Sequence, residues 1–246
     1  MATRSAPVRE APERSARTRL PELWSAHLGR MPYAEGVALQ ERLRTRRQAG
    51  EIPDALLLLE HPPVYTTGRR TGPADLPMGK DFYRTRGIEV EASDRGGRVT
   101  YHGPGQVVGY PIVVVGDVLE YVRSVERAVV AALADSGVEA GVREGLTGVW
   151  VEDRKIGSIG VHVSRGVTTH GFAVNVENDL EPFEWIVPCG LAGVRMTSIA
   201  RETGAGGEVD RFRRRVAFRL AEALGRRQRI VSLPRLERSG ALRPGG

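Results

Sequence analysis

The strongest constraint on the fold of this chain is one short apolar run. The segment Asp54–Glu60 (DALLLLE) holds an alanine and four consecutive leucines between two acidic residues. A strand with one face in water alternates apolar and polar side chains, whereas this run has no alternation and only the length of a strand. It predicts a central strand of a sheet that is buried on both faces.

Three helices and several further strands are predicted around this run. Asp117 is the expected N-cap of the clearest helix, with Glu120 completing a capping box and Gly137 ending the helix. The other predicted helices span Tyr33–Gln48 and Arg211–Leu224. Strands are predicted at Glu22–Leu28, Ile88–Glu91, Gln106–Val115, Lys155–Val163 and Val167–Val176, the last two as a hairpin, and a loop at Thr66–Lys80.

Length and composition favour a single domain. A chain of 246 residues, of which 41% are hydrophobic, can bury a substantial core, and it shows no internal repeat or linker. We predict the fold class α/β (α+β), a mixed sheet with packed helices, in one domain over residues 21–232. Residues 1–20 are expected to form a disordered N-terminal arm and residues 233–246 a disordered C-terminal tail.

Charge and cysteine content point to a protein of the reducing cytoplasm. The formal net charge of +6 is spread along the chain and over both ends, and we interpret it mainly as solvation rather than as a nucleic-acid site. A single cysteine excludes an internal disulfide and a cysteine-rich zinc site. No apolar run approaches the roughly 20 residues that a membrane span needs.

Lysine use is unusual in this chain. Only Lys80 and Lys155 are lysines, and the other 34 basic residues are arginines. Arginine stays protonated in proteins, whereas a desolvated lysine can give up its proton. Lys155 shares strand parity with Ile159, Val161 and Val163, so it should point inward if no bulge intervenes. We interpret Lys155 as a candidate for proton chemistry. The alternative is that a lysine occurs here by chance and forms a salt bridge.

Histidines of the predicted hairpin are sorted by the same parity rule. His170 shares parity with Phe172, Val174 and Val176 and should face inward, while His162 should face outward. His170 could serve as a base, but a hydrogen-bonded core histidine is the plainer interpretation.

Cys189 is the candidate nucleophile. Pro188 before it and Gly190 after it favour an irregular backbone with little steric cover over the thiol. A reactive cysteine also needs a base, because the thiolate is the attacking species. Lys155 is the favoured partner. A Cys-His hydrolase is the other pairing, although nothing near Cys189 matches the thiol-protease motifs.

A glycine-rich segment over residues 94–106 is the candidate ligand loop. Its four glycines allow a close approach to a ligand, and the spacing is not that of a phosphate-binding loop. A set of tight turns with a structural His102 is the alternative.

One long motif runs through this segment. The pattern R-G-G-x-x-T-aromatic-H-x-x-G-Q is matched by Arg95, Gly96, Gly97, Thr100, Tyr101, His102, Gly105 and Gln106. With LLLLEHP at 56–62, Tyr65 and Gly68-Arg69-Arg70, K-I-x-x-I-G at 155–160, H-G-F-A-x-N at 170–175 and V-P-C-G at 187–190, the chain resembles the lipoate-protein octanoyltransferases over residues 23–223.

The resemblance implies the biotin/lipoate protein ligase-like fold and an acyltransferase without cofactor or metal. Cys189 would attack octanoyl-acyl carrier protein to form a thioester, and Lys155 would act as the general base. The octanoyl group would then pass to a lysine on lipoyl domains of 2-oxoacid dehydrogenase E2 subunits and of the glycine cleavage H protein. A monomer that binds neither nucleic acid nor membrane is expected.

The resemblance also implies which residues line the acyl and pantetheine site. They are Arg95, Gly96, Gly97, Arg98, Val99, Thr100, Tyr101, His102, Ser158, Ile159, Gly160, Gly171, Phe172 and Ala173, with His61 and His170 as residues that shape the site. Two alternatives stay open: an ATP-dependent lipoate or biotin protein ligase on the same fold, and a non-catalytic basic binding protein.

Overall fold

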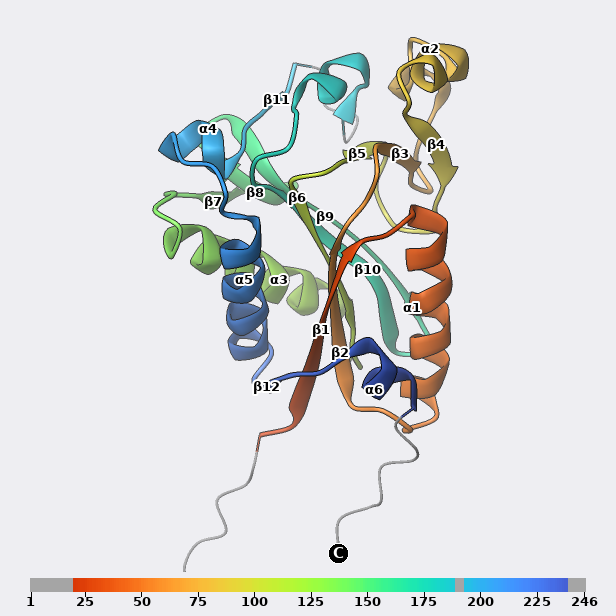
Figure 1. The fold of residues 1–246 in the computed structure, drawn as a ribbon, viewed down its shortest axis with the longest axis vertical. Coiled ribbons are helices and arrows are strands. Elements are labelled where there is room, and N and C mark those ends of the chain that lie inside the picture. Colours follow the sequence, from red (N-terminus) through yellow and green to blue (C-terminus); the bar gives the residue numbers. More distant parts are fainter. Residues whose placement is uncertain (1–19, 189–192, 239–246) are drawn as a thin grey trace, which may run out of the picture.

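The computed structural model describes residues 20–188 and 193–238. Within these ranges a nine-stranded mixed sheet lies between two layers of helices, and a three-stranded sheet lies at one end (Figure 1). The large sheet has the strand order β12, β1, β2, β6, β10, β9, β8, β7, with β11 paired to β9. Its strands are β1 Glu22–Arg30, β2 Asp54–Glu60, β6 Gln106–Ile112, β7 Gly141–Arg143, β8 Leu146–Val151, β9 Arg154–Ser164, β10 Val167–Asn175, β11 Arg195–Met196 and β12 Arg227–Ile230.

Strand β2 is a central strand of the large sheet. It pairs in parallel with β1 and antiparallel with β6. Leu56 and Leu58 belong to the core cluster on one face, whereas Leu57 and Leu59 belong to the cluster on the other, and all four are fully buried. The prediction of a central strand with two buried faces is confirmed.

Different helices cover the two faces. Helices α3 (Val118–Ala134) and α5 (Val209–Ala223) pack against each other and against the face that holds Leu56. Helices α1 (Tyr33–Gln48) and α6 (Leu233–Arg238) pack on the face that holds Leu57 (Figure 1). The three predicted helices are present to within about two residues, and α4 (Ile199–Thr203) adds one short turn.

The N-terminus of α3 is capped as expected, although without the reciprocal box. The Asp117 carboxylate accepts from the backbone N–H groups of Leu119 at 2.8 Å and Glu120 at 3.1 Å. The Glu120 carboxylate instead accepts from Arg127 at 2.7 Å. Asp117 therefore stabilises the first turn on its own.

A small sheet stands at the end of the large one (Figure 1). Its strands are β3 (Val64–Thr67), β4 (Glu89–Ala92) and β5 (Thr100–His102), in the order β4, β3, β5. Helix α2 (Lys80–Thr85) and the 3₁₀ turns η1 (Pro73–Asp75) and η2 (Glu181–Trp185) lie beside it. The predicted loop is shorter than expected, because Thr66 and Thr67 belong to β3 and Lys80 begins α2.

The C-terminal tail was wrongly predicted as disordered from residue 233. Residues 233–238 form α6, whose Leu236 is fully buried in the core cluster beside α1. The guanidinium of Arg46 on α1 donates to the carbonyl of Leu236 at 2.9 Å. Arg46 also donates to the carbonyl of Glu237, and Arg42 forms an ion pair with the Glu237 carboxylate. These contacts with α1 stabilise a segment that is too short to form a helix alone.

None of the described helices combines the length and the apolar composition that a membrane crossing requires.

Candidate active site

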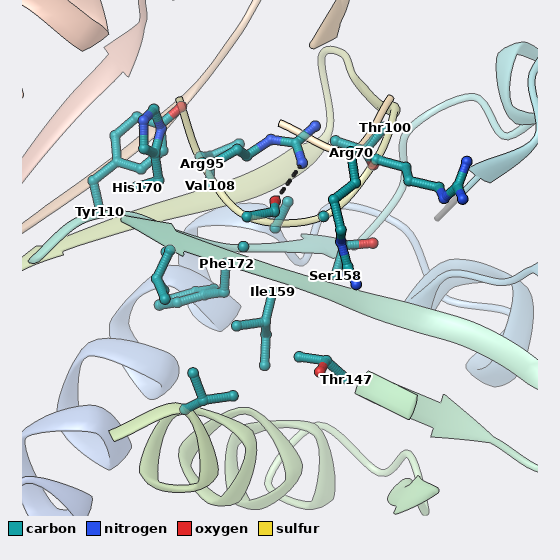
Figure 2. Close-up of a pocket in the computed structure, with 18 of the residues that line it drawn as sticks. Arg70, Arg95, Thr100, Val108, Tyr110, Thr147, Ser158, Ile159, His170 and Phe172 are labelled. Atoms are coloured by element: carbon teal, nitrogen blue, oxygen red, sulfur yellow. Dashed lines mark hydrogen bonds between the residues drawn. The ribbon is translucent and has the colours of Figure 1, made fainter. Parts of the chain in front are cut away.

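A cavity of about 550 Å³ opens between β9, β10, the loop 94–98 and the start of α3 (Figure 2). Most of the residues expected in the acyl and pantetheine site lie around it. Those that line it are Arg95, Gly96, Gly97, Arg98, Thr100, His102, Ser158, Ile159, Gly160, Gly171, Phe172, Ala173, Lys155 and His170. Val99 and Tyr101 do not; both are buried in the core of the small sheet.

The loop 94–98 is fixed by backbone hydrogen bonds on both sides. Gly96 N–H donates to the carbonyl of Val161 at 3.0 Å, which attaches the loop to the part of β9 that lies beyond its pairing with β8. On its other side Arg70 N–H donates to the carbonyl of Gly97 at 3.0 Å. Gly68 permits this contact, because a Cβ there would lie 2.5 Å from the Gly97 carbonyl oxygen. The glycines of both motifs let two loops pack backbone to backbone.

Arg95 is part of the scaffold of the cavity as well as of its wall. Its side chain is buried, and Nη2 donates to the backbone carbonyl of Thr66 at 2.6 Å and to the Thr66 hydroxyl at 2.8 Å. A guanidinium can make both bonds at once because its donors are held in a planar fork. Arg95 therefore ties the loop 94–98 to β3.

A buried polar chain continues from Thr66 through His102. His102 Nδ1 lies 2.7 Å from Gln106 Oε1, which can only accept, so Nδ1 carries the proton. Gln106 Nε2 donates to Asn175 Oδ1 at 2.9 Å, and Asn175 Nδ2 donates to the carbonyl of Thr197 at 3.0 Å. Burial and the nearby His61 lower the pKa of His102 to about 3, so the ring is neutral at pH 7.

His61 lies behind the cavity wall rather than in it. Its Nδ1–H donates to the carbonyl of Met31 at 2.6 Å, and its Nε2 accepts from the hydroxyl of Tyr110, also at 2.6 Å. Burial lowers the pKa of His61 to about 4, despite the backbone bond that opposes this shift. His61 thus positions Tyr110, which lines the cavity.

Lys155 is almost fully buried and borders the cavity. Its side chain is 2% exposed, and Nζ donates to the carbonyl of Thr147 at 3.3 Å and lies 5.4 Å from the centre of the Trp150 ring. Gly148 makes room for it, because a Cβ there would come within 2.7 Å of the Lys155 Cε. Lys155 is thus held in a close-fitting slot formed by β8.

The parity argument for Lys155 does not hold. The register between β8 and β9 shifts between the pairs Val149–Gly157 and Trp150–Lys155. As a result Ile156 and Ile159, which differ in parity, pack against the same core cluster. Lys155 owes its burial to this irregularity and to its neighbours on β8, not to strict alternation with Ile159.

His170 also departs from the predicted alternation. Its φ of 57° is left-handed, and its N–H donates to Gln40 Oε1 at 2.6 Å. The ring therefore lies on the α1 side, beside Tyr110, and not with Phe172 in the opposite core cluster. His170 is buried, as predicted, and His162 is more exposed, but the two rings do not lie on opposite faces, because both contact Asp94, at 2.6 and 3.7 Å.

Asp94 joins this pair of histidines to the loop. Partial burial alone would raise the pKa of the Asp94 carboxyl, but the hydrogen bond from His170 and the proximity of His170 and His162 lower it below its usual range. Burial lowers the pKa of His170 itself, against the opposing effect of Asp94. The carboxylate thus anchors the start of the loop 94–98 to β10. Among the described residues no group of three or more His, Cys, Asp or Glu side chains could hold a metal ion.

Cys189 lies outside the described residues, but its neighbours on both sides are placed. Before it, Val187 N–H donates to the carbonyl of Asp75 at 3.0 Å, and Pro188 is buried. After it, Met196 of β11 lies opposite Lys155, and Thr197 N–H donates to the Lys155 carbonyl at 2.9 Å. The described chain that follows Cys189 therefore pairs with β9 at Lys155.

Sequence reasoning missed several residues of the cavity. Tyr33 and Tyr110 lie at its aromatic end, and nothing in strand or helix periodicity marks them. Val118, Leu119 and Val122 of α3 also line it. Their apolar character at the start of α3 was an available signal, since Val118 is 43% exposed and Leu119 is 66% exposed.

Comparison with known proteins agrees with this geometry. The family model of the lipoyl protein ligase A/B catalytic domain matches residues 32–221. The chain belongs to this family. It is 47% identical to the octanoyltransferase of Acidobacterium capsulatum, over 72% of this chain and 78% of that one, and 49% identical to the octanoyltransferase of Acidothermus cellulolyticus, over 80% and 90%.

Solved structures show the fold of this lipoyl ligase and transferase family. A bi-partite lipoate protein ligase from Thermoplasma acidophilum, studied with its E2 lipoyl domain, superposes with a TM-score of 0.67 at 18% identity, covering 90% of each chain. The predicted mixed α/β ligase-like fold is confirmed. The identities to the two octanoyltransferases likewise confirm the predicted resemblance and the assignment of the chain as a transferase enzyme.

Proposed function

We propose that this enzyme transfers an octanoyl group from octanoyl-acyl carrier protein, through a thioester on Cys189, to the ε-amine of a lysine on a lipoyl domain. The observation that carries the proposal is the position of Lys155. It is a buried amine at the border of a mainly apolar cavity, and the segment that holds the chain's one cysteine ends in a strand opposite it.

The first half-reaction forms the acyl-enzyme. Lys155 Nζ takes the thiol proton of Cys189, and the thiolate attacks the thioester carbonyl of the donor. A new carbon–sulfur bond forms at Cys189 while the bond to the carrier's thiol breaks. The departing thiolate receives the proton from Lys155, so the base returns to its starting state and no group is oxidised or reduced.

The second half-reaction passes the group to the acceptor. The lysine amine of the lipoyl domain attacks the Cys189 thioester and gives a proton to Lys155. A carbon–nitrogen bond forms, the bond to Cys189 breaks, and the thiolate recovers the proton from Lys155. A thioester is a higher-energy acyl donor than an amide, so this sequence needs no nucleotide triphosphate.

The cavity suits a medium-length acyl chain. Its volume lies in the range of small-molecule sites, about 300–1,000 Å³. Val108, Val122, Ile159 and Phe172 supply apolar wall, and each methylene group buried there contributes about 0.8 kcal/mol. The buried rings of Tyr33 and Tyr110 close the end of the cavity where His170 lies, which limits the length of chain that fits.

An adenylate-forming ligase is the nearest rival, because the fold is shared with lipoate protein ligases. The transferase is favoured by relatives named octanoyltransferase at 47% and 49% identity, against 18% for that ligase. A non-catalytic basic binding protein would have no use for a buried lysine beside an apolar cavity. That alternative predicts binding governed by surface arginines and weakened by salt.

The mass of the enzyme after mixing with octanoyl-acyl carrier protein, in the absence of ATP, tests the proposal. We expect an increase of one octanoyl group, located on Cys189 by peptide mapping, and its loss when a lipoyl domain is added. The Cys189→Ala variant, which keeps Lys155, should remain unmodified. An enzyme that stays unmodified until ATP and free acid are supplied would be a ligase instead.

A further inference from the structure

Two arginines at the open side of the cavity have no role in the mechanism above. Arg70 and Arg98 both line the cavity, and both are exposed residues. Arg98 contacts one carboxylate, that of Asp75, at 3.2 Å. Among the described residues no ion pair is recorded for Arg70. The two guanidinium groups thus share a single negative charge, and the mouth of the cavity carries an excess of positive charge.

The backbone holds these two arginines close to each other. Gly68 N–H donates to the carbonyl of Arg98 at 3.4 Å, and Arg70 N–H donates to that of Gly97 at 3.0 Å. The loops that carry them are therefore paired along their backbones. Two guanidinium groups that start from paired backbones and line the same cavity offer the forked donors that match the oxygens of a phosphate.

Asp75 relates this pair to the reacting segment. Its buried carboxylate accepts a hydrogen bond from the Arg98 guanidinium. Its backbone carbonyl accepts from the N–H of Val187, two residues before Cys189. Figure 2 shows Arg70 and Ser158 toward one end of the cavity, with Tyr110 and His170 at the other. Arg70 thus lies on the side opposite the aromatic end, and Arg98, on the loop paired with that of Arg70, contacts the residue that binds the chain leading to the nucleophile.

We propose that Arg70 and Arg98 bind the phosphoryl group of the phosphopantetheine arm that carries the acyl donor. This inference rests on the proposed function, because it takes the donor to be a phosphopantetheine thioester. Such an arm is uncharged between its thioester and its phosphate. We place the thioester at Lys155 and the acyl chain toward Tyr110, so the arm leaves through the mouth of the cavity. Its one charged group, the phosphate, then meets Arg70 and Arg98, the one exposed pair of cavity-lining arginines in the described part of the chain.

Two small donors that differ only in the phosphate test the inference. The rate of Cys189 acylation is measured with octanoyl-4′-phosphopantetheine and with octanoyl-pantetheine at low salt. We expect the enzyme to prefer the phosphorylated donor by about 10- to 100-fold, the range that one or two charge-assisted hydrogen bonds provide. Added sodium chloride should reduce this preference, because the arginines are exposed.

Variants assign the preference to the two side chains. Arg70→Gln and Arg98→Gln should each reduce the ratio between the donors, and Arg70→Glu should bring it to one or below. Arg70 is the cleaner site, since Arg98→Gln also leaves the buried Asp75 without its cation. Arg42→Gln, which removes a 59% exposed arginine on α1, is the matched control and should keep the full ratio.

The possible outcomes distinguish failure of the phosphate site from failure of the proposed transferase function. Acylation of Cys189 by both donors at equal rates, or a full preference in the Arg70→Glu enzyme, would overturn the phosphate site while leaving the transferase intact. Acylation by neither small donor nor octanoyl-acyl carrier protein would overturn both. A faster reaction with the carrier protein than with octanoyl-4′-phosphopantetheine would measure contacts of the carrier beyond the phosphate.

Discussion

The Nδ1–H of His102 donates to Oε1 of Gln106 over 2.7 Å, and this bond fixes the tautomer of a buried, neutral ring. Gln106 then passes the chain of donors on to Asn175 and the carbonyl of Thr197, whose own N–H binds the Lys155 carbonyl. The R-G-G loop and the strand of Lys155 are therefore joined by one polar network inside the core. Such a network is stabilising only while every member is satisfied.

Replacement of Lys155 by arginine separates charge from proton transfer. The guanidinium keeps the positive charge but stays protonated, so acyl transfer should fall by about 10²- to 10⁴-fold, the usual contribution of a general base. Single-turnover acylation of Cys189 is the measurement. Lys80→Arg, at the one other lysine, is the control and should transfer at the normal rate. Full activity of the Lys155→Arg enzyme would show that only charge is needed there.

Gly148→Ala should reduce acyl transfer in the enzyme that remains folded. The new Cβ would lie 2.7 Å from Lys155 Cε, and displacing the amine by even one ångström can cost about 100-fold in rate. Gly137→Ala makes a matched control, because it also has a positive φ but no atom within 4 Å of the new Cβ. Gly137→Ala should lose about 1 kcal/mol of stability from backbone strain. Gly148→Ala should lose more, because its Cβ would also lie 2.7 Å from the Gly157 carbonyl oxygen, and it alone should lose transfer. Equal transfer rates would contradict the role given to this slot.

Acid should weaken the fold through its buried histidines. His61 and His102 have pKa values lowered by burial to about 4 and about 3, against about 6.5 in an unfolded chain. The unfolded state therefore binds more protons below pH 6.5, and the free energy of unfolding is complete above that pH and falls as the pH drops toward 4. The expected slope is about 1.4 kcal/mol per pH unit for each histidine.

Urea unfolding at pH 7, 6 and 5 measures this slope. His61→Gln keeps an acceptor for Tyr110 but cannot be protonated in this range, so its stability should depend less steeply on pH than that of the unmodified enzyme. The same slope in both proteins would mean that other groups govern acid unfolding.

Leu236→Ala should destabilise the enzyme although it lies close to the C-terminus. The side chain is fully buried against the α1 layer, and such truncations cost about 2–5 kcal/mol. Thermal or urea unfolding checks the loss. Ser232→Ala, just before α6, is a suitable comparison and should change stability by less than about 1 kcal/mol. If the Leu236→Ala protein were as stable as the unmodified enzyme, the packing of α6 would not contribute to the stability of the fold.

The parts of the fold that the sequence predicted correctly are those set by local rules. Four consecutive leucines indicate a strand buried on both faces without reference to any other segment. Asp117 caps α3 through N–H groups only two and three residues away. Helix α6 was missed because its order depends on Arg46, which is far away in the chain.

The candidate site shows the same division between local and distant causes. The glycine motif identified the loop 94–98, since close backbone packing needs glycine wherever it occurs. The inward position of Lys155 and His170 was predicted, but not its cause, because one depends on a register shift with β8 and the other on a left-handed residue held by Gln40. Tyr33 and Tyr110 meet at the cavity only through the packing of α1 on the sheet.

The parallel pairing of β1 with β12 has a consequence for how the protein is made. Glu22 lies opposite Arg227, so β1, which is early in the chain, pairs on its outer side with β12, which is more than 190 residues later. During translation the outer edge of β1 must therefore wait, with its N–H and C=O groups unpaired, until residues 227–230 have left the ribosome. A chain released before that point would carry an open sheet edge, so the stretch of synthesis between β1 and β12 is exposed to aggregation.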